Sequence, residues 1–472
     1  MQPSFRRTKI VCTIGPATAS LDVLKELIRT GMNVARLNFS HGDHKGHRET
    51  IRKIRQAARE EDRPVGILQD LAGPKIRIGR IKDRQLNTGD DVRLISGTEE
   101  IDGALPVNYP YLCQDLSEGE SILMADGRVE LQILKVNEEY LLAKVINGGM
   151  LSANKGVNLP GSDLRISAFT DKDREDLEFG LTEGVDFVAM SFVRHEKDLV
   201  PLRERISTVT DRPLIVAKIE KPQAVQRLEP IIAAVDGVMV ARGDLGVEMP
   251  FEDVPLVQKK IIREARTAGK VVITATQMLG SMVESPRPSR AEVADVANAI
   301  LDGTDAVMLS EETAVGKYPV KAVSVLDRIA VKTESSLDPK RFFEDDISNK
   351  LPLSGAAVSR AAAWMAVDLN AAFIVAATTS GSTARVMARL RPPNPILGFT
   401  ANPATHRQLC LSCGVIPALV PAYDDFDEML WQINRYLKDN DLARRESRII
   451  LTAGTPLNVP GTTNLIKVFK IE

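Results

Sequence analysis

The sequence predicts an α/β protein built on an eight-stranded (β/α)₈ TIM barrel, with an all-β lid domain inserted into the barrel and an α/β domain at the C-terminus. Three observations lead to this fold class. Eight short apolar runs alternate with stretches of helical periodicity. The runs are continuous rather than alternating in polarity, as a parallel sheet covered by helices requires. One interval between runs is far too long for a loop, and a second α/β rhythm follows the barrel.

The expected barrel strands follow one another along the first part of the chain. They are Thr8–Ile14, Asn33–Phe39, Val65–Leu71, Val185–Phe192, Pro213–Ile219, Gly237–Ala241, Val271–Thr276 and Ala306–Leu309. Helical periodicity fills the intervening segments, as in Leu21–Thr30, Arg48–Glu60, Asp171–Thr182 and Arg290–Asp302. Eight strand–helix units fit a closed barrel better than an open doubly wound sheet.

The interval between the third and fourth strands predicts a separate domain. Residues 73–168 contain valine- and leucine-rich runs divided by Gly and Asp turns, which is typical of an all-β unit. Inserted at the catalytic end of a barrel, this unit is placed to act as a lid. We therefore expect barrel residues at 1–72 and 169–340.

The C-terminal part, residues 341–472, predicts a regulatory α/β domain. A charged, proline-containing stretch around 338–350 suits a linker before it. The expected strands lie near Phe373–Thr378, Ile396–Thr400, Val415–Val420, Arg448–Thr452 and Leu465–Ile471.

The composition excludes several classes of partner. The 472 residues include 61 basic and 63 acidic side chains, a net charge of −2, so no overall field favours nucleic acid or a membrane. No apolar run reaches the length of a bilayer span, and the N-terminus lacks a signal-peptide core, which predicts a cytoplasmic protein. Cys410 and Cys413 form an isolated CxxC, better explained by packing than by redox or zinc chemistry.

Polar residues gather at the carboxyl ends of the expected strands, where barrel enzymes keep their catalytic groups. Any one of them could belong to a structural ion pair, but such pairs do not cluster at one end. The set predicts a single active site at that end. Its members are Arg36, Asn38, Ser40, Asp70, Lys218, Glu220, Arg242, Asp244, Thr276, Ser310 and Glu311.

The chemistry of this set indicates a divalent metal and an anionic substrate. Glu220 and Asp244 offer hard oxygen ligands from neighbouring strands, a pattern that suits Mg²⁺ or Mn²⁺. Lys218 lies on the same strand face as Glu220. A metal and a lysine in one pocket suit an enolate or a transferring phosphoryl group. Gly243 lets backbone N–H groups approach an anion, and the Thr276 hydroxyl can bind a carboxylate or relay a proton.

Seven motifs stand in order along the chain: RLNFSHGD at 36–43, GPKIR at 73–77, NKGVNLPG at 154–161, KIE at 218–220, ARGDLG at 241–246, TATQML at 274–279 and MLSEET at 308–313. With them the chain resembles pyruvate kinase of the bacterial type over essentially its whole length. The resemblance implies transfer of the phosphoryl group of phosphoenolpyruvate to ADP in glycolysis, giving pyruvate and ATP. It also implies a homotetramer.

The resemblance assigns roles position by position. It implies that Arg36 grips the transferring phosphoryl group, that Lys218 stabilises this group and the enolate, and that Glu220 and Asp244 bind the metal. Gly243, Asp244 and Thr276 would surround the substrate carboxylate. The nucleotide residues would be Asn38, His41, Arg77 and Lys155, and the monovalent-cation site would consist of Asn38, Ser40, Asp70 and the Leu71 carbonyl.

The chain departs from potassium-dependent members at the GPxIR motif, where Lys75 stands in place of glutamate. A lysine ammonium can replace a monovalent cation beside Asp70, so we expect activity without K⁺ and Lys75 as the internal cation. The alternative is that Lys75 points to solvent.

A hydroxyl-rich segment in the C-terminal domain resembles the family's effector-phosphate loop and precedes a helix expected near 382–391. It consists of Thr378, Thr379, Ser380, Gly381, Ser382 and Thr383. Hydroxyls and free N–H groups there form an anion site, although a simple N-cap turn is the alternative. The late loop Gly454–Asn464 has no Arg, Lys or Trp for a second phosphate. We therefore expect a sugar monophosphate or AMP as effector, with Arg385, Arg389 or Arg407 as possible sources of charge.

Two other functions fit part of the pattern. An aldolase-like barrel acting on a pyruvate enolate would share the Glu/Asp metal pair, but would not need Arg36 or a lid bearing Arg77 and Lys155. A sugar-phosphate sensor on a degenerate barrel would not need an intact Lys218 and metal pair.

Overall fold

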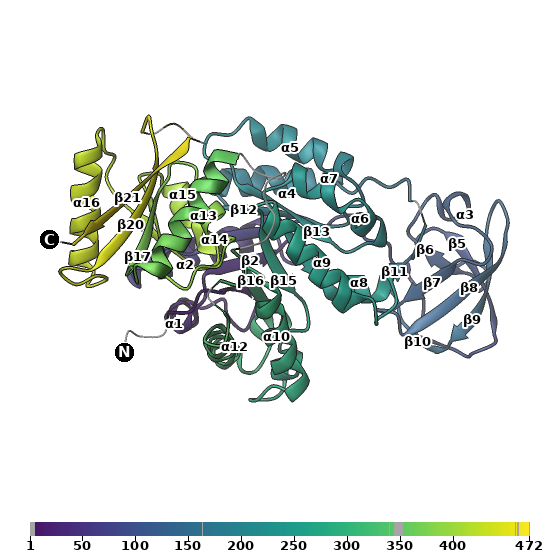
Figure 1. The fold of residues 1–472 in the computed structure, drawn as a ribbon. Coiled ribbons are helices and arrows are strands. Elements are labelled where there is room, and N and C mark those ends of the chain that lie inside the picture. Colours follow the sequence, from purple (N-terminus) through teal and green to yellow (C-terminus); the bar gives the residue numbers. More distant parts are fainter. Residues whose placement is uncertain are drawn as a thin grey trace.

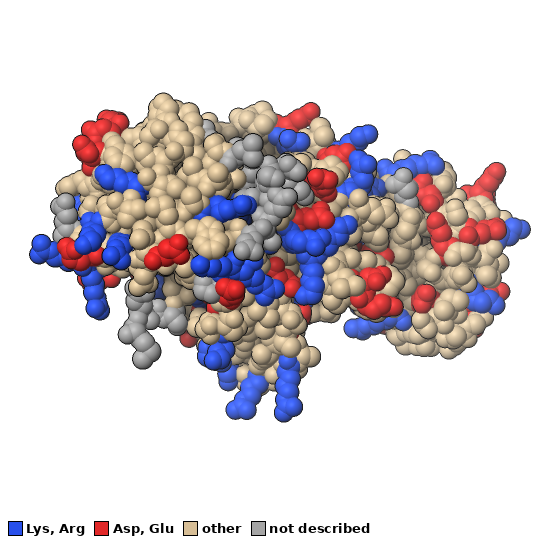
Figure 2. All heavy atoms as spheres, in the orientation of Figure 1, with Lys and Arg blue, Asp and Glu red and all other residues tan. Residues whose placement is uncertain are grey.

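The computed structural model describes residues 5–471 except 163, 339, 344–352, 458, 460 and 461. Its three parts lie in a row, with the β-rich insertion and the C-terminal domain at opposite ends of a central barrel (Figure 1). Within the described residues, no helix is both long and apolar enough to span a bilayer. Basic and acidic side chains are interspersed over the face shown in Figure 2, as the near-zero net charge predicts.

Eight parallel strands close into a barrel in the order β1-β16-β15-β14-β13-β12-β3-β2. This confirms the predicted fold class, and the strand ends differ from the predicted ones by no more than two residues. The strands are β1 (Lys9–Thr13), β2 (Val34–Asn38), β3 (Gly66–Asp70), β12 (Phe187–Met190), β13 (Leu214–Ile219), β14 (Gly237–Ala241), β15 (Val271–Ala275) and β16 (Ala306–Leu309).

Several helices around the barrel start at side chains that satisfy their free N–H groups. Ser20 caps α1, Thr170 and Asp173 form a capping box on α4, and Ser289 with Glu292 does the same on α10. The long helices are α1 (Leu21–Thr30), α2 (His44–Glu60), α4 (Asp171–Glu183), α9 (Val254–Thr267), α10 (Arg290–Asp302) and α12 (Pro319–Glu334). The shorter ones are α5 (Val200–Ser207), α6 (Pro222–Gln226), α7 (Leu228–Ala234), α8 (Arg242–Glu248) and α11 (Glu311–Ala314).

One barrel helix starts earlier than its periodicity predicts. We expected the second helix to begin at Arg48, but α2 begins at His44. The carboxylate of Asp43 accepts a hydrogen bond from the Gly46 N–H at 2.8 Å and caps an extra turn that is too polar to show in a hydrophobic pattern.

Between β3 and α4 the chain forms a β-rich unit with a core of its own, which includes Tyr109 and Leu131. A six-stranded sheet has the order β11-β7-β8-β9-β5-β6, and a second sheet pairs β10 with β4. The strands are β4 (Arg84–Leu86), β5 (Asp91–Ser96), β6 (Leu105–Val107), β7 (Ser121–Met124), β8 (Val129–Val136), β9 (Leu141–Asn147), β10 (Gly149–Leu151) and β11 (Val157–Asn158), with one helical turn, α3 (Leu112–Asp115).

The C-terminal domain is a five-stranded sheet in the order β19-β18-β17-β20-β21, with only β21 antiparallel. Its strands are β17 (Phe373–Ala377), β18 (Ile396–Thr400), β19 (Val415–Leu419), β20 (Arg448–Gly454) and β21 (Thr463–Lys470), close to the five expected runs. Its helices are α13 (Leu353–Asp368), α14 (Ser382–Ala388), α15 (Pro403–Gln408) and α16 (Phe426–Asp439). The helix expected near 382–391 is therefore shorter than predicted.

The C-terminal domain closes the amino-terminal end of the barrel. Cys410 and Leu411 belong to the same buried cluster as the barrel-strand residues Val11 and Leu68. The Cys410 thiol donates to the Pro64 carbonyl at 3.4 Å, and burial raises its pKa to about 12. This cysteine of the CxxC pair is therefore a packed core residue in a thiol form.

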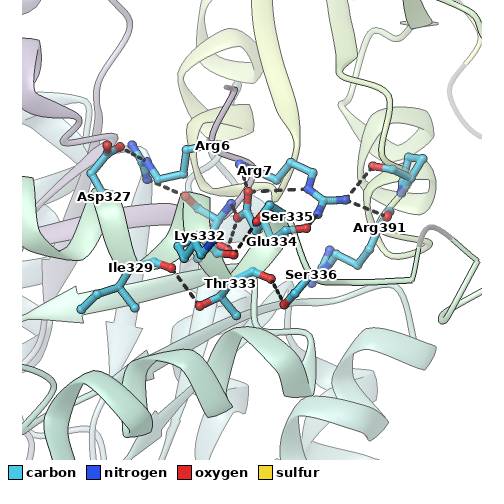
Figure 3. A network of polar contacts seen from close by, with 12 residues as sticks. Arg6, Arg7, Asp327, Ile329, Lys332, Thr333, Glu334, Ser335, Ser336 and Arg391 are labelled. Carbon is cyan, nitrogen blue, oxygen red and sulfur yellow. Dashed lines mark hydrogen bonds and ion pairs between the residues drawn. The ribbon is translucent and has the colours of Figure 1, made fainter. Parts of the chain in front are cut away.

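A polar network joins the two domains beside this contact (Figure 3). Glu334, at the end of α12, accepts hydrogen bonds from the Arg7 N–H at 2.8 Å and from the Thr8 hydroxyl at 2.6 Å. The Arg7 guanidinium reaches the Arg391 carbonyl of the C-terminal domain at 3.4 Å, and Arg391 pairs with Asp305 at the barrel base. Only the carboxyl ends of the strands are left to form an active site.

Candidate active site

The carboxyl ends of the barrel strands open into a cleft of about 250 Å³ beneath the inserted unit. The cleft lies between the two chain segments that enter and leave this unit. Its lining includes Lys75, Arg77, Asn158, Phe192, Lys221 and Asp244.

Four of the predicted residues form one network on the floor of this region. Arg36 on β2 donates from Nε to an Asp70 carboxylate oxygen at 2.7 Å, and Asp70 closes β3. Lys218 on β13 places its Nζ 3.4 Å from Asp70 and 2.7 Å from Glu220. Two cations and two carboxylates from three strands therefore meet at one point, as the strand-end pattern predicts.

The charges in this network hold each other in their ionised forms. Asp70 is 1% exposed, and burial opposes its ionisation, but Lys218 and Arg36 outweigh burial and lower its pKa. Burial likewise opposes the charge of Lys218, yet Asp70, Glu220 and Asp244 raise its pKa above the ordinary lysine value. Lys218 is a permanent cation at this site.

Glu220 and Asp244 lie where a divalent ion would be shared between protein and substrate. Glu220 is 2% exposed and accepts the Phe192 N–H at 2.9 Å, whereas Asp244 opens onto the cleft. Burial and then the negative charge of Glu220 raise the pKa of Asp244 to about 6. Within the described residues, no set of three or more His, Cys, Asp or Glu side chains could enclose a metal. Two crowded carboxylates fit Mg²⁺ or Mn²⁺, which keep water and substrate oxygens in their coordination shells.

Gly243 and Thr276 lie beside Lys218's strand, just beyond the ends of β14 and β15, the two strands that follow β13 around the barrel. The Thr276 hydroxyl accepts the Gly243 N–H at 2.7 Å and donates to the Ala275 carbonyl at 2.6 Å. Thr276 has a φ of +66°, which a β-branched residue rarely adopts. Arg242 holds this turn by donating to the Thr276 carbonyl at 2.6 Å. Backbone strain of this kind is concentrated at functional sites, where a side chain must be held in one orientation.

The oxygens expected to bind a monovalent cation are partly engaged by the protein. Asn38 accepts the Ser40 N–H at 3.1 Å, and the Leu71 carbonyl accepts the Ser191 hydroxyl at 2.8 Å. Lys75 is half-buried in the cleft, close enough to Asp70 for their charges to interact. Within the described part of the chain, however, Lys75 forms no ion pair with Asp70.

The expected nucleotide residues differ in whether they line the cleft. Arg77 lines the cleft and donates to the Asn154 carbonyl at 2.6 Å, which ties the entering segment to the leaving one. His41 is exposed near Lys75 and Arg77, and burial together with these charges lowers its pKa. Lys155 is exposed and is not among the residues that line the cleft.

Two residues that the sequence analysis overlooked belong to the network. The Thr13 hydroxyl at the end of β1 accepts from the Arg36 guanidinium at 2.9 Å. The Ser191 hydroxyl, just after β12, accepts from Lys218 Nζ at 2.8 Å and so links Lys218 to the Leu71 carbonyl. Both lie at strand ends, so inspecting all eight ends would have found them. Ser310 and Glu311, in contrast, take no part in the network's hydrogen bonds among the described residues.

A second pocket lies in the C-terminal domain at the hydroxyl-rich segment. Its lining includes Thr378, Thr379, Ser380, Ser382 and Thr383, together with Tyr423 and residues of the late loop such as Thr462 and Thr463. Gly381 has a φ of +80°, and the Ser380 hydroxyl donates to that of Ser382 at 3.2 Å. Residues 458, 460 and 461 of the late loop lie outside the described residues.

Of the three arginines considered as sources of charge for this pocket, one contacts the hydroxyl-rich segment. Arg385 donates to the Ser380 carbonyl at 2.7 Å. Arg389 points towards the barrel, where it donates to the Thr267 carbonyl at 3.4 Å, and Arg407 pairs with Asp186 at 2.7 Å. Of these three arginines, Arg385 therefore lies nearest to the hydroxyl groups of the pocket, although it is not among the residues that line it.

Comparison with protein families finds two matches that together span most of the chain. Residues 5–323 match the family model described as the pyruvate kinase barrel domain. Residues 356–469 match the one described as the pyruvate kinase alpha/beta domain.

Individual relatives agree with the family models. Pyruvate kinase 2 of Synechocystis sp. is 48% identical over 99% of this chain and 79% of its own length. A pyruvate kinase of Mycobacterium tuberculosis is 44% identical over 99% of this chain and 98% of its own. A crystal structure of a pyruvate kinase from Cryptosporidium parvum superimposes with a TM-score of 0.94 at 36% identity, covering 99% of this chain and 96% of that one.

Proposed function

Because the chain belongs to the pyruvate kinase family, we propose that the cleft between barrel and insertion is where its chemistry occurs. The enzyme transfers the phosphoryl group of phosphoenolpyruvate to ADP, which yields pyruvate and ATP in glycolysis. The family depends on Mg²⁺. The matches favour this reaction over the aldolase-like and sensor alternatives.

The observation that carries the site assignment is that Asp70 contacts both Arg36 and Lys218, and that Lys218 also contacts Glu220. Asp70 and Thr13 fix the Arg36 guanidinium, and Ser191 with Glu220 fixes Lys218 Nζ. Phosphoryl transfer needs positioning and charge neutralisation more than covalent catalysis. Two pre-positioned cations would stabilise the negative charge of the phosphoryl group as it leaves the substrate.

Lys218 would also stabilise the enolate oxygen that remains after transfer. The Gly243 N–H and the Thr276 hydroxyl would face the substrate carboxylate, and Thr276 would join a water chain that delivers a proton to the methylene carbon. A divalent ion held by Glu220 and Asp244 would supply Lewis-acid polarisation of phosphoryl and enolate oxygens. Asn38, His41, Arg77 and Lys155 would contact the nucleotide.

The metal assignment can be tested without the reaction. Glu220→Gln keeps the shape and the Phe192 hydrogen bond but removes a ligand charge, so the dissociation constant for Mn²⁺ should rise by more than about tenfold. Glu196→Gln is the control, because Glu196 forms an ion pair with Arg227 away from the cleft. Unchanged Mn²⁺ affinity in Glu220→Gln would reject the site.

Potassium independence is a further part of the proposal. Lys75 is half-buried in the cleft, and its ammonium is close enough to Asp70 for their charges to interact. We assign it as the internal cation that replaces K⁺ near Asn38, Ser40, Asp70 and Leu71.

The hydroxyl-lined pocket of the C-terminal domain is proposed to bind the phosphate of an effector. Five hydroxyl side chains and the Arg385 guanidinium suit one phosphate group, which favours a sugar monophosphate or AMP over fructose 1,6-bisphosphate. The test compares half-saturating phosphoenolpyruvate concentrations with ribose 5-phosphate, AMP and fructose 1,6-bisphosphate added separately. A response to the bisphosphate alone rejects the assignment.

We also propose that residues 73–168 act as the lid, that 1–72 with 169–340 form the catalytic barrel, and that 341–472 form the regulatory domain of a cytoplasmic homotetramer. Exposed apolar side chains support assembly: Phe251 is 79% exposed and Trp431 is 59% exposed. Analytical ultracentrifugation tests this, because a monomeric mass at micromolar concentration contradicts a stable tetramer.

A further inference from the structure

A buried carboxylate outside the residues assigned above joins three parts of the cleft. Glu248 is the last residue of α8, the helix whose first turn carries Asp244, and it is 5% exposed. Its Oε1 accepts hydrogen bonds from Lys221 Nζ at 2.5 Å and from Asn158 Nδ2 at 2.8 Å. Lys221 directly follows Glu220, and Asn158 lies on lid strand β11. Glu248 lies on the helix of Asp244, and its Oε1 therefore connects this helix to the loop that follows Glu220 and to the lid.

The burial of this group makes the contact specific. A carboxylate removed from water must be paired and hydrogen-bonded, and Lys221 supplies the balancing charge from a position that is itself buried. The Lys221 ammonium also lies 5.6 Å from the centre of the Phe192 ring. Both side chains are largely shielded from water, and Glu248 Oε2 has no hydrogen-bond partner among the described residues, so the contacts of Oε1 hold the carboxylate in place.

The lid reaches this pair through strand β11. Figure 1 shows β11 beside the end of that helix. The turn at Gly127 approaches it too, because a Cβ at this position would lie 3.9 Å from Val247. Other lid contacts reach different parts of the barrel: Arg194, in the loop after β12, donates to the Ile166 carbonyl at 2.9 Å, and Gln223 on α6 donates to the Ser162 carbonyl at 3.4 Å. Among the described residues, Asn158 thus ties the lid sheet to the metal-binding helix by a side-chain hydrogen bond.

We propose that Glu248 is a positioning residue that fixes the lid relative to the Glu220–Asp244 pair. This inference rests on the assignment of the cleft as the active site. Because Arg77 lines the cleft on the lid side and Asn158 lies in the neighbouring strand, the contact sets the distance between nucleotide-binding groups and metal ligands. Its loss should impair ADP binding far more than phosphoenolpyruvate binding, since the latter depends on barrel residues alone.

The test removes only the lid half of the contact. Asn158→Ala leaves the Lys221–Glu248 pair intact and should raise KM for ADP about tenfold, the equivalent of one hydrogen bond to a charged group. KM for phosphoenolpyruvate should stay within about twofold. Hydrogen exchange in residues 154–162 should accelerate. The control is Asn147→Ala, because Asn147 Nδ2 makes the same kind of bond to Glu130 at 2.8 Å, but within the lid.

A second variant keeps the test decisive if the alanine protein folds poorly. Asn158→Asp places a second carboxylate against Glu248, and the repulsion should raise KM for ADP further. The inference is overturned if Asn158→Ala matches Asn147→Ala in KM for ADP. It is also overturned if both substrates lose affinity together with a lowered thermal midpoint, which marks a purely structural contact. Normal Mn²⁺ affinity in Glu220→Gln would instead reject the site assignment itself.

Discussion

Alkaline pH should switch the enzyme from potassium-independent to potassium-activated. Burial, followed by the neighbouring charges of Arg77 and Lys218, lowers the pKa of Lys75 to about 8. A lysine is cationic below its pKa, so about nine-tenths of the molecules carry the Lys75 charge near pH 7 and about one-tenth near pH 9. If that charge replaces K⁺, its loss leaves a site that an external cation can fill.

The size of the effect follows from these fractions. Near pH 7, KCl should change the rate of pyruvate formation by no more than about 10%, and near pH 9 it should raise the rate up to about tenfold. The assay uses buffers free of sodium, potassium and ammonium, with tetramethylammonium chloride to match ionic strength. Lys75→Glu should require K⁺ at both pH values. Lys82→Glu, which makes the same charge change at an exposed position, should not.

Three results would refute this reasoning. A strong K⁺ requirement of the parent enzyme near pH 7 would show that Lys75 does not act as the cation. A Lys75→Glu variant that stays indifferent to K⁺ would show the same thing from the opposite direction. A potassium response that is equal at both pH values would show that the charge state of Lys75 does not control the response.

Three further predictions concern the metal, the domain joint and the effector pocket. The pKa of Asp244 is raised to about 6, so its carboxylate is charged above that pH. The Mn²⁺ affinity of the substrate-free enzyme should therefore fall about tenfold per pH unit below pH 6. A Mn²⁺ affinity that does not change with pH in electron paramagnetic resonance titrations contradicts this. Glu334→Ala leaves Arg7 and Thr8 without their buried partner and should lower the free energy of unfolding in urea by about 3 kcal/mol. The control Glu446→Ala removes an exposed pair with Lys470 and should leave this free energy unchanged. Equal urea midpoints for the two variants would show that Glu334 does not stabilise the contact between the domains. Ser380→Ala combined with Ser382→Ala should abolish the response to the activating effector and leave the unactivated rate unaltered, and an undiminished response would place the effector elsewhere.

The barrel could be predicted from the sequence because each of its strands is a continuous apolar run with polar residues at one end. That regularity also located Arg36, Asp70, Lys218 and Glu220, since parallel strands bring their carboxyl ends together. Thr13 and Ser191 also lie at strand ends and were open to the same reasoning, but their hydrogen-bond partners depend on strand register and could not be predicted.

Contacts between the lid and the barrel could not be predicted. Asn158 and Glu248 are separated by 90 positions, and their meeting depends on how the lid sheet is oriented on α8. The same orientation leaves Lys155 exposed although Arg77, across the hinge, lines the cleft. Helix ends were equally unpredictable: α2 gained a turn at its N-terminus from its cap, and α14 ended at Ala388, three residues earlier than expected.

The most direct test of the account is the turnover of Lys218→Met. Methionine keeps the aliphatic stem but removes the cation that contacts Asp70, Glu220 and Ser191, while Arg36 still pairs with Asp70. We predict a folded protein that binds Mn²⁺ at least as tightly as its parent but forms pyruvate from phosphoenolpyruvate and ADP about 100-fold to 1,000-fold more slowly, or worse. A Lys218→Met enzyme with turnover within about tenfold of the parent would contradict the assigned chemistry.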